Sequence, residues 1–84
     1  MSIRVKVLYF GQTRDASGVR EEDFSLPDRT PLRTLLERAR SSHAGLERMK
    51  SMQIALNEDI AKGDERLKDG DVVALIPPVA GGWG

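Results

Sequence analysis

The feature that most limits the possible folds of this chain is a single amphipathic helical segment, residues 30–45, with strand-like segments on both sides of it. Thr30 is placed to cap this helix and Pro31 to occupy its first position, and the helix should stop near Gly45. Its apolar residues recur with the spacing of one helical face and are Leu32, Leu35, Leu36 and Ala39. One apolar stripe is buried against one surface, so we expect a sheet to cover it.

The segments around the helix alternate like strands. Residues 3–10 predict a strand that points Ile3, Val5, Val7 and Tyr9 inward. A turn-rich segment, 11–18, with room for a helical turn, leads to a second strand containing Phe24 and Leu26. After the helix we expect strands over residues 52–57 and 72–76, with a very short edge strand around Ile60 between them.

This order of elements is typical of an α+β fold. Strand, strand, helix, strand, short strand and strand indicate a β-grasp, ubiquitin-like domain over residues 1–76, with a mixed sheet of four to five strands on one main helix. Residues 77–84, PPVAGGWG, then form a flexible C-terminal tail that carries a diglycine. Pro77 and Pro78 lack the N–H that pairs into a sheet, so they should end the last strand.

Composition argues against several classes of protein. The 84 residues include 13 Lys and Arg and 13 Asp and Glu, so we expect neither a nucleic-acid nor a membrane partner. There is no cysteine, and the one histidine, His43, makes no metal site alone; we interpret it as a surface residue near a helix end. The apolar VKVLYF is too short for a signal peptide, which favours a cytoplasmic protein.

Several segments together resemble the MoaD family, the small subunit of molybdopterin synthase. They are the opening VLYFGQTRDASG, the helix, ALNED and the closing LKDGDVVALIPPVAGG, and they cover almost the whole chain. The related thiamine sulfur carrier, ThiS, shares the fold and the diglycine but usually lacks the segment that stands here as Pro77, Pro78 and Val79. The resemblance to MoaD is therefore the closer one.

The resemblance implies a sulfur carrier that is not an enzyme by itself and binds no cofactor. A MoeB-like adenylating enzyme would use ATP to activate the carboxyl group of Gly82, which sulfur would convert to a thiocarboxylate. A MoaE-like large subunit, in an expected heterotetramer, would then build the dithiolene of molybdopterin from a cyclic pyranopterin precursor. The tail residues Pro77, Pro78, Val79, Ala80 and Gly81 would carry Gly82 into the partner, since six extended residues span up to ~20 Å.

The sheet face away from the helix is the predicted docking surface. Leu8, Phe10, Ala74 and Ile76 should point outward there, beside the start of the tail. The resemblance assigns partner contacts to Phe10, Ile60 and Ile76, and Arg14 could form an ion pair with an acidic residue of a partner. The alternative is that these are ordinary exposed apolar side chains.

Trp83 and Gly84 depart from the family pattern, in which the second glycine is the last residue. We expect a processing peptidase to remove them; a changed chain end or a paralogue diverted from sulfur transfer are the alternatives. Other functions for the activated glycine also stay open. They are a sulfur carrier for thiamine, cysteine or secondary metabolism, and a ubiquitin-like modifier conjugated to lysines.

Overall fold

The computed structural model describes residues 1–49 and 52–77. Its elements are β1 (Ser2–Tyr9), α1 (Gln12–Ser17), β2 (Glu21–Pro27), α2 (Leu32–Ser42), α3 (Ala44–Glu47), β3 (Gln53–Leu56), β4 (Asp59–Ile60) and β5 (Val72–Ile76). The strand order in the sheet is β2-β1-β5-β3-β4. Because β1 and β5 run parallel and the other neighbours antiparallel, the predicted mixed sheet and β-grasp order are confirmed.

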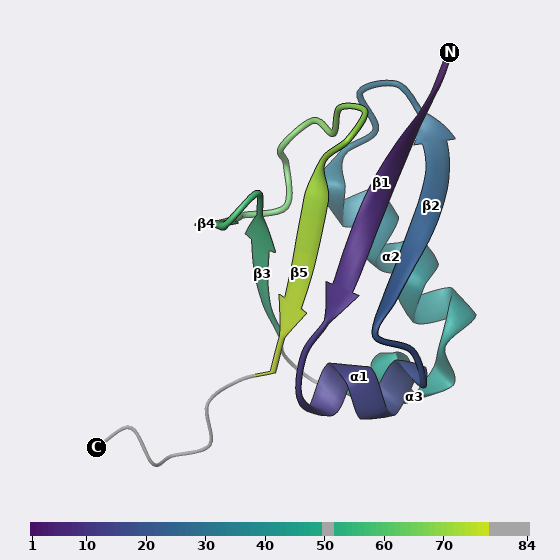
Figure 1. The fold of residues 1–84 in the computed structure, drawn as a ribbon, viewed down its shortest axis with the longest axis vertical. Coiled ribbons are helices and arrows are strands. Elements are labelled where there is room, and N and C mark those ends of the chain that lie inside the picture. Colours follow the sequence, from purple (N-terminus) through teal and green to yellow (C-terminus); the bar gives the residue numbers. More distant parts are fainter. Residues whose placement is uncertain (50–51, 78–84) are drawn as a thin grey trace.

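The sheet has one covered face and one open face. In Figure 1, α2 lies behind the sheet, while α1 and α3 lie together at the end where β1 stops. Within the described residues, no helix crosses the front of the sheet (Figure 1). The fold therefore leaves a whole sheet face available beside the last residue of β5.

The core lies between α2 and the sheet and follows the predicted alternation. Alternate residues of β1 are buried, and Phe24 and Leu26 of β2 join them. The buried residues of α2 are Leu32, Leu35 and Ala39, whereas Leu36 is only partly buried against the same cluster. The helical stripe and the strand pattern thus meet as expected.

The predicted start and end of the main helix are wrong. Pro31 is the N-cap of α2, and Thr30 is buried before it, where its hydroxyl donates to the Pro27 carbonyl at 2.6 Å. The N–H groups of Leu32 and Arg33 each find a loop carbonyl at 2.9 Å, on Glu65 and Gly63 respectively. Because a distant loop supplies these acceptors, the helix needs no side-chain cap.

The helix also ends earlier than expected, at Ser42, and α3 follows at once. Gly45 lets α3 approach α1 closely. A Cβ at Gly45 would lie 2.5 Å from the carbonyl oxygen of Ala16, which is closer than any real contact of this kind. The absence of a side chain at this position is therefore a packing requirement.

We predict that Gly45→Ala lowers the free energy of unfolding by about 1–3 kcal/mol, because the new methyl group forces α3 away from α1. Urea denaturation of both proteins measures the difference. Ser41→Ala, at an exposed position of α2, is the control and should change stability by less than about 0.5 kcal/mol. Equal stability of Gly45→Ala and the unmodified chain would contradict the packing argument.

Candidate functional site

A row of apolar residues crosses the open face of the sheet. Leu8 of β1 pairs with Ala74 of β5, Ala74 pairs with Ala55 of β3, and Ala55 pairs with Ile60 of β4. Directly paired residues point to the same side of a sheet, and the sequence neighbours of Leu8 are buried on the opposite side. We call this surface, with Phe10, Val72 and Ile76, the outer face.

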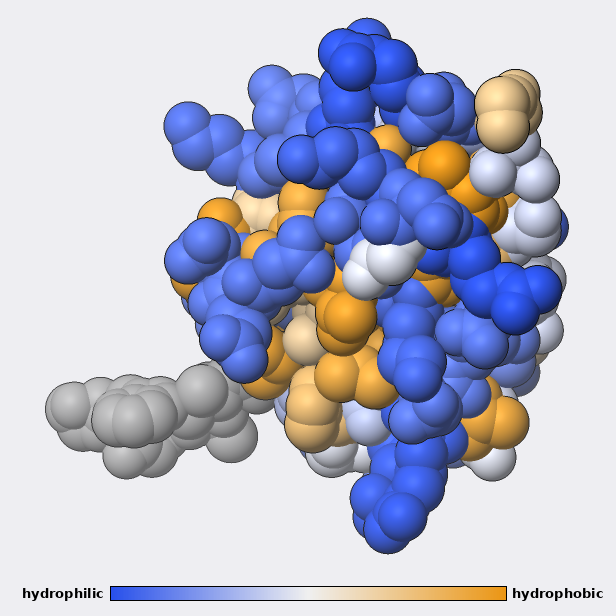
Figure 2. All heavy atoms as spheres, turned by 45° about the horizontal axis from the view of Figure 1, so that its top comes forward, coloured by the Kyte–Doolittle hydropathy of each residue, from blue (hydrophilic) through white to orange (hydrophobic). Residues whose placement is uncertain are grey.

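Two predicted docking residues are exposed on or beside the outer face. Phe10 is 48% exposed and Ile60 is 65% exposed, while Ile76 is half-buried at the end of β5. Figure 2 shows hydrophobic residues in the middle of the view, with hydrophilic residues around them. The structure thus brings Phe10, Ile60 and Ile76 to one side of the sheet, as the sequence predicts; their role in partner binding stays a prediction.

Phe10 lines two adjoining hollows. One lies on the outer face and is lined by Leu8, Phe10, Asn57, Glu58, Val72 and Ala74. The other lies toward α1 and is lined by Leu8, Tyr9, Phe10, Gly11, Arg14 and Arg20. Arg14 is therefore close to the outer face, and it forms no ion pair with any described residue. Its charge is free for a partner, although that role also stays a prediction.

The position of Ile60 depends on the turn that joins β3 to β4. Asn57 and Glu58 join β3 to β4 with left-handed φ values of 50° and 75°. The Asn57 amide donates to Asp71 Oδ1 at 3.0 Å, and its side-chain oxygen accepts from the Val72 N–H at 2.9 Å. The turn is thereby fastened to the start of β5. Asparagine tolerates left-handed backbone, so the residue type at position 57 suits this turn.

The tail begins beside α1. Pro77 is half-buried, and a Cβ added to Gly11 would lie 3.1 Å from its Cγ, so the two residues are in close contact. Pro78, Val79, Ala80, Gly81, Gly82, Trp83 and Gly84 lie outside the described residues. The structure therefore fixes the place from which the predicted tail starts.

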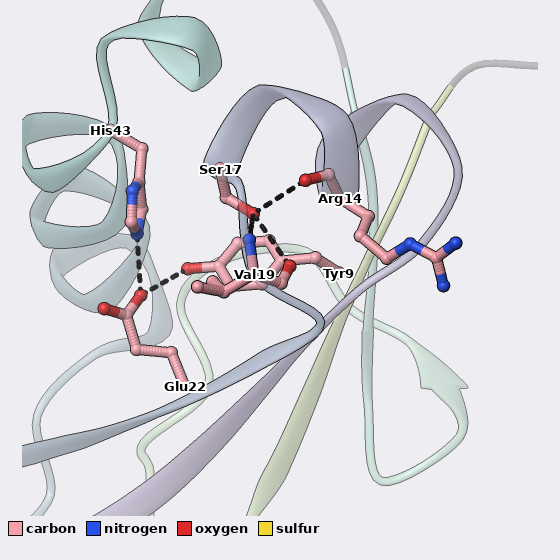
Figure 3. A network of polar contacts seen from close by, with 6 residues as sticks. All are labelled: Tyr9, Arg14, Ser17, Val19, Glu22 and His43. Atoms are coloured by element: carbon pink, nitrogen blue, oxygen red, sulfur yellow. Dashed lines mark hydrogen bonds and ion pairs between the residues drawn. The ribbon is translucent and has the colours of Figure 1, made fainter.

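His43 is not the surface residue that the sequence suggested. Its Nε2 lies 2.8 Å from Glu22 Oε1, and the Tyr9 hydroxyl donates to the same carboxylate oxygen at 2.8 Å (Figure 3). The Tyr9 and His43 rings meet edge to face, with centroids 5.8 Å apart. The network joins β1, β2 and the junction of α2 with α3, so its side chains are structural.

The environment changes the pKa of two groups in this network. Burial, followed by the hydrogen bond and charge of Glu22, raises the pKa of the Tyr9 phenol. Burial also acts to raise the pKa of Glu22, but hydrogen bonds with His43 and Tyr9 and the charge of His43 outweigh it and lower that pKa. The arrangement therefore favours a neutral Tyr9 and an ionised Glu22.

The ThiS family model matches residues 7–82 of the chain. This chain belongs to the ThiS family. The match spans the fold described above and ends at the second glycine of the diglycine. This family match, together with the molybdopterin synthase sulfur carrier subunits among the relatives, confirms the expected resemblance.

Relatives of this ThiS-family chain include sulfur carriers. It is 40% identical to the molybdopterin synthase sulfur carrier subunit of Chlamydomonas reinhardtii, over 95% of this chain and 100% of the relative. A putative molybdopterin converting factor subunit 1 from Pyrococcus furiosus has a similar structure, with a TM-score of 0.85, 36% identity and coverage of 92% of this chain and 99% of that one.

A complex of subunits 1 and 2 of molybdopterin-converting factor from Helicobacter pylori also contains a similar chain. The TM-score is 0.62 and the identity 34%, with 95% of this chain and 100% of that chain covered. In the described part of this ThiS-family chain, no helix has the length and apolar character needed to cross a bilayer.

We predict that Glu22→Gln lowers the free energy of unfolding by about 1 kcal/mol near pH 7, because it replaces the charged hydrogen-bond acceptor. The folded-state pKa of Glu22 is below its usual 4.5, so its contribution is present above pH 4.5 and is lost as pH falls through the folded-state pKa. The difference in free energy of unfolding between the variant and the unmodified chain should therefore become smaller at acidic pH. Urea denaturation at several pH values measures it.

Glu21→Gln is the matched control for this prediction. Glu21 lies on the same strand, and its ion pair with Lys6 at 3.2 Å joins two exposed side chains. An exposed pair contributes about 0–1 kcal/mol, so the control should have a smaller effect. A Glu22→Gln difference that stayed constant from pH 7 to pH 3 would contradict the assignment.

Proposed function

We propose that this chain is the sulfur carrier subunit of a molybdopterin synthase in molybdenum cofactor biosynthesis. The observation that carries the proposal is the 40% identity, over nearly the whole chain, with a protein of that name. The exposed apolar outer face beside Pro77 supports it, because a carrier must present its C-terminal end to other proteins.

The chemistry takes place at the Gly82 carboxyl group. An adenylating partner joins this carboxylate to AMP from ATP and releases pyrophosphate. A sulfide-level nucleophile then attacks the acyl carbon, forms the carbon–sulfur bond and displaces AMP, which leaves a thiocarboxylate. Transfer of that sulfur to the pyranopterin precursor and hydrolysis return the carboxylate, so the carrier supplies an acyl end and the partners supply the catalytic groups.

Two kinds of partner dock on the outer face in this proposal. The similarity to a chain from the Helicobacter pylori complex of subunits 1 and 2 supports a large synthase subunit as one of them. The assembly in this proposal is a heterotetramer. The second is a MoeB-like adenylating enzyme that uses ATP, and the proposed compartment is the cytoplasm. Phe10, Ile60 and Ile76 form the apolar contact, and Arg14 pairs with an acidic residue at its edge.

Gly82 is followed here by Trp83, so its carboxyl group is held in a peptide bond. Adenylation needs a free carboxylate, and the family match ends at Gly82. A peptidase therefore has to cleave after Gly82 before the carrier is active. The indole of Trp83 is also far larger than the hydrogen that forms a glycine side chain, which disfavours activation at Gly84 instead.

We predict that Phe10→Ala and Ile60→Asp weaken binding to the large subunit by about one to two powers of ten, the effect of losing roughly 1.5–3 kcal/mol of apolar burial. Both side chains are exposed, so melting temperatures should change little. Titration calorimetry with the large subunit measures the affinity. Glu37→Ala, on the exposed side of α2, is the control. Unchanged affinity in both outer-face variants would remove this surface from the proposal.

We predict that the sequence ending at Gly84 yields no thiocarboxylate at Gly82, whereas the same sequence ending at Gly82 does. Both forms are incubated with the adenylating enzyme, ATP and a sulfide donor, and intact mass spectrometry follows the exchange of oxygen for sulfur. Equal thiocarboxylate yield with Trp83 and Gly84 still attached would refute the cleavage requirement. Lysine-linked conjugates in place of a thiocarboxylate would favour a protein modifier.

A further inference from the structure

Thr13 is a fully buried polar residue of α1 whose hydroxyl lies where β1 and β5 end. The Phe10 N–H donates to Thr13 Oγ1 at 2.8 Å. The same hydroxyl lies 2.7 Å from the Phe10 carbonyl oxygen and 2.9 Å from the Leu75 carbonyl oxygen. One side chain therefore contacts the ends of two strands that come from opposite ends of the chain.

The hydrogen-bond inventory indicates where the hydroxyl hydrogen goes. A threonine hydroxyl has one hydrogen to donate and lone pairs to accept with. The Phe10 carbonyl accepts from the Thr13 N–H at 3.0 Å. Among the described residues, the Leu75 carbonyl has only the longer bond of 3.2 Å from the Phe10 N–H, which that group shares with Thr13 Oγ1, so donation of the hydroxyl hydrogen to Leu75 supplies the weaker-bonded carbonyl. Tyr9 and Leu75 are the last pair of the parallel β1–β5 ladder. Thr13 thus extends the connection between these strands beyond their final pair.

Both ends of this bridge belong to the proposed docking region. Phe10 is an exposed residue beside the outer face, and Leu75 directly precedes Ile76 and Pro77. The hydroxyl consequently fixes the backbone that carries Phe10 relative to the backbone from which the tail starts. The direct hydrogen bond from the Phe10 N–H to the Leu75 carbonyl is 3.2 Å long. It is longer than the bond from the Phe10 N–H to Thr13 Oγ1, 2.8 Å, and the bond from Thr13 Oγ1 to the Leu75 carbonyl, 2.9 Å.

We propose that Thr13 is a positioning residue for carrier docking, which holds Phe10 and the start of the tail in the orientation that the partners bind. The inference rests on the proposed function. Without the hydroxyl, the Phe10 segment samples other backbone conformations, and a partner binds only the fraction in the competent one. Removal of the hydroxyl therefore lowers the affinity for the partners, while the chemistry at Gly82 is unchanged.

The test compares Thr13→Val, which keeps the shape and removes the hydroxyl, with Thr13→Ser, which keeps the hydroxyl. Thr30→Val is the matched control. The Thr30 hydroxyl is also buried and donates to the Pro27 carbonyl at 2.6 Å, but Pro27 pairs with Ser2 at the opposite end of β1. A general loss of stability therefore affects the Thr13 and Thr30 variants alike.

Three measurements are made on proteins that end at Gly82, below their melting temperatures. They are the dissociation constant for the large subunit, kcat and KM of the adenylating enzyme with the carrier as substrate, and amide hydrogen exchange at Phe10. For Thr13→Val we expect affinity to fall about fivefold to tenfold, the size of one net hydrogen bond, with KM raised and kcat unchanged. Exchange at Phe10 should be faster.

Thr13→Ser should restore affinity to within about twofold, and Thr30→Val should bind like the unmodified carrier. Normal affinity of Thr13→Val, or an equal loss in Thr30→Val, would overturn the positioning role while leaving the sulfur-carrier proposal standing. Failure of the unmodified carrier to bind the large subunit or to be adenylated would instead overturn the proposed function, and the role of Thr13 with it.

Discussion

The parallel pairing of β1 with β5 is the interaction on which the rest of the structure depends. Its register runs from Lys6 opposite Val72 to Tyr9 opposite Leu75, and it joins strands from the two ends of the chain. Closing so long a loop costs conformational entropy, which the apolar side chains packed against α2 must offset. In the sheet, β2 pairs with the other side of β1 and β3 with the other side of β5. The outer face and the start of the tail are therefore consequences of one ladder, because Phe10 follows β1 where Pro77 follows β5.

The elements and the faces of their residues were predictable because they depend on local periodicity. Alternation in β1 and the leucine spacing in α2 decide which side chains are buried, and both expectations hold. Features that depend on distant partners were missed. Thr30 does not cap α2, since the carbonyls of Glu65 and Gly63 receive the first helical N–H groups. The sequence predicts a surface position for His43 because its partners lie on β1 and β2, and no local pattern connects them.

Two sets of polar contacts hold the end of β1. On the core side, Tyr9 donates to Glu22, which is also bonded to His43. One residue later, the backbone of Phe10 is bonded to Thr13 and Leu75. Successive strand residues point to opposite faces, so fixing the Tyr9 ring inward also constrains the backbone that turns Phe10 outward. Hydrogen bonds are directional, whereas apolar burial is not, which explains why polar groups set this orientation inside an otherwise apolar core.

Recognition of a carrier of this kind has to come from its folded body. Gly81 and Gly82 have no side chains for a partner to distinguish, and a formal net charge of zero provides no long-range electrostatic attraction. Apolar contact then carries most of the recognition, and Phe10 and Ile60 stay 48% and 65% exposed although burial would stabilise the isolated chain. A few central apolar side chains commonly supply most of the affinity of an interface. A carrier that passes from an activating enzyme to a synthase must also dissociate from each, and a small apolar face inside a hydrophilic border suits binding that is specific yet reversible.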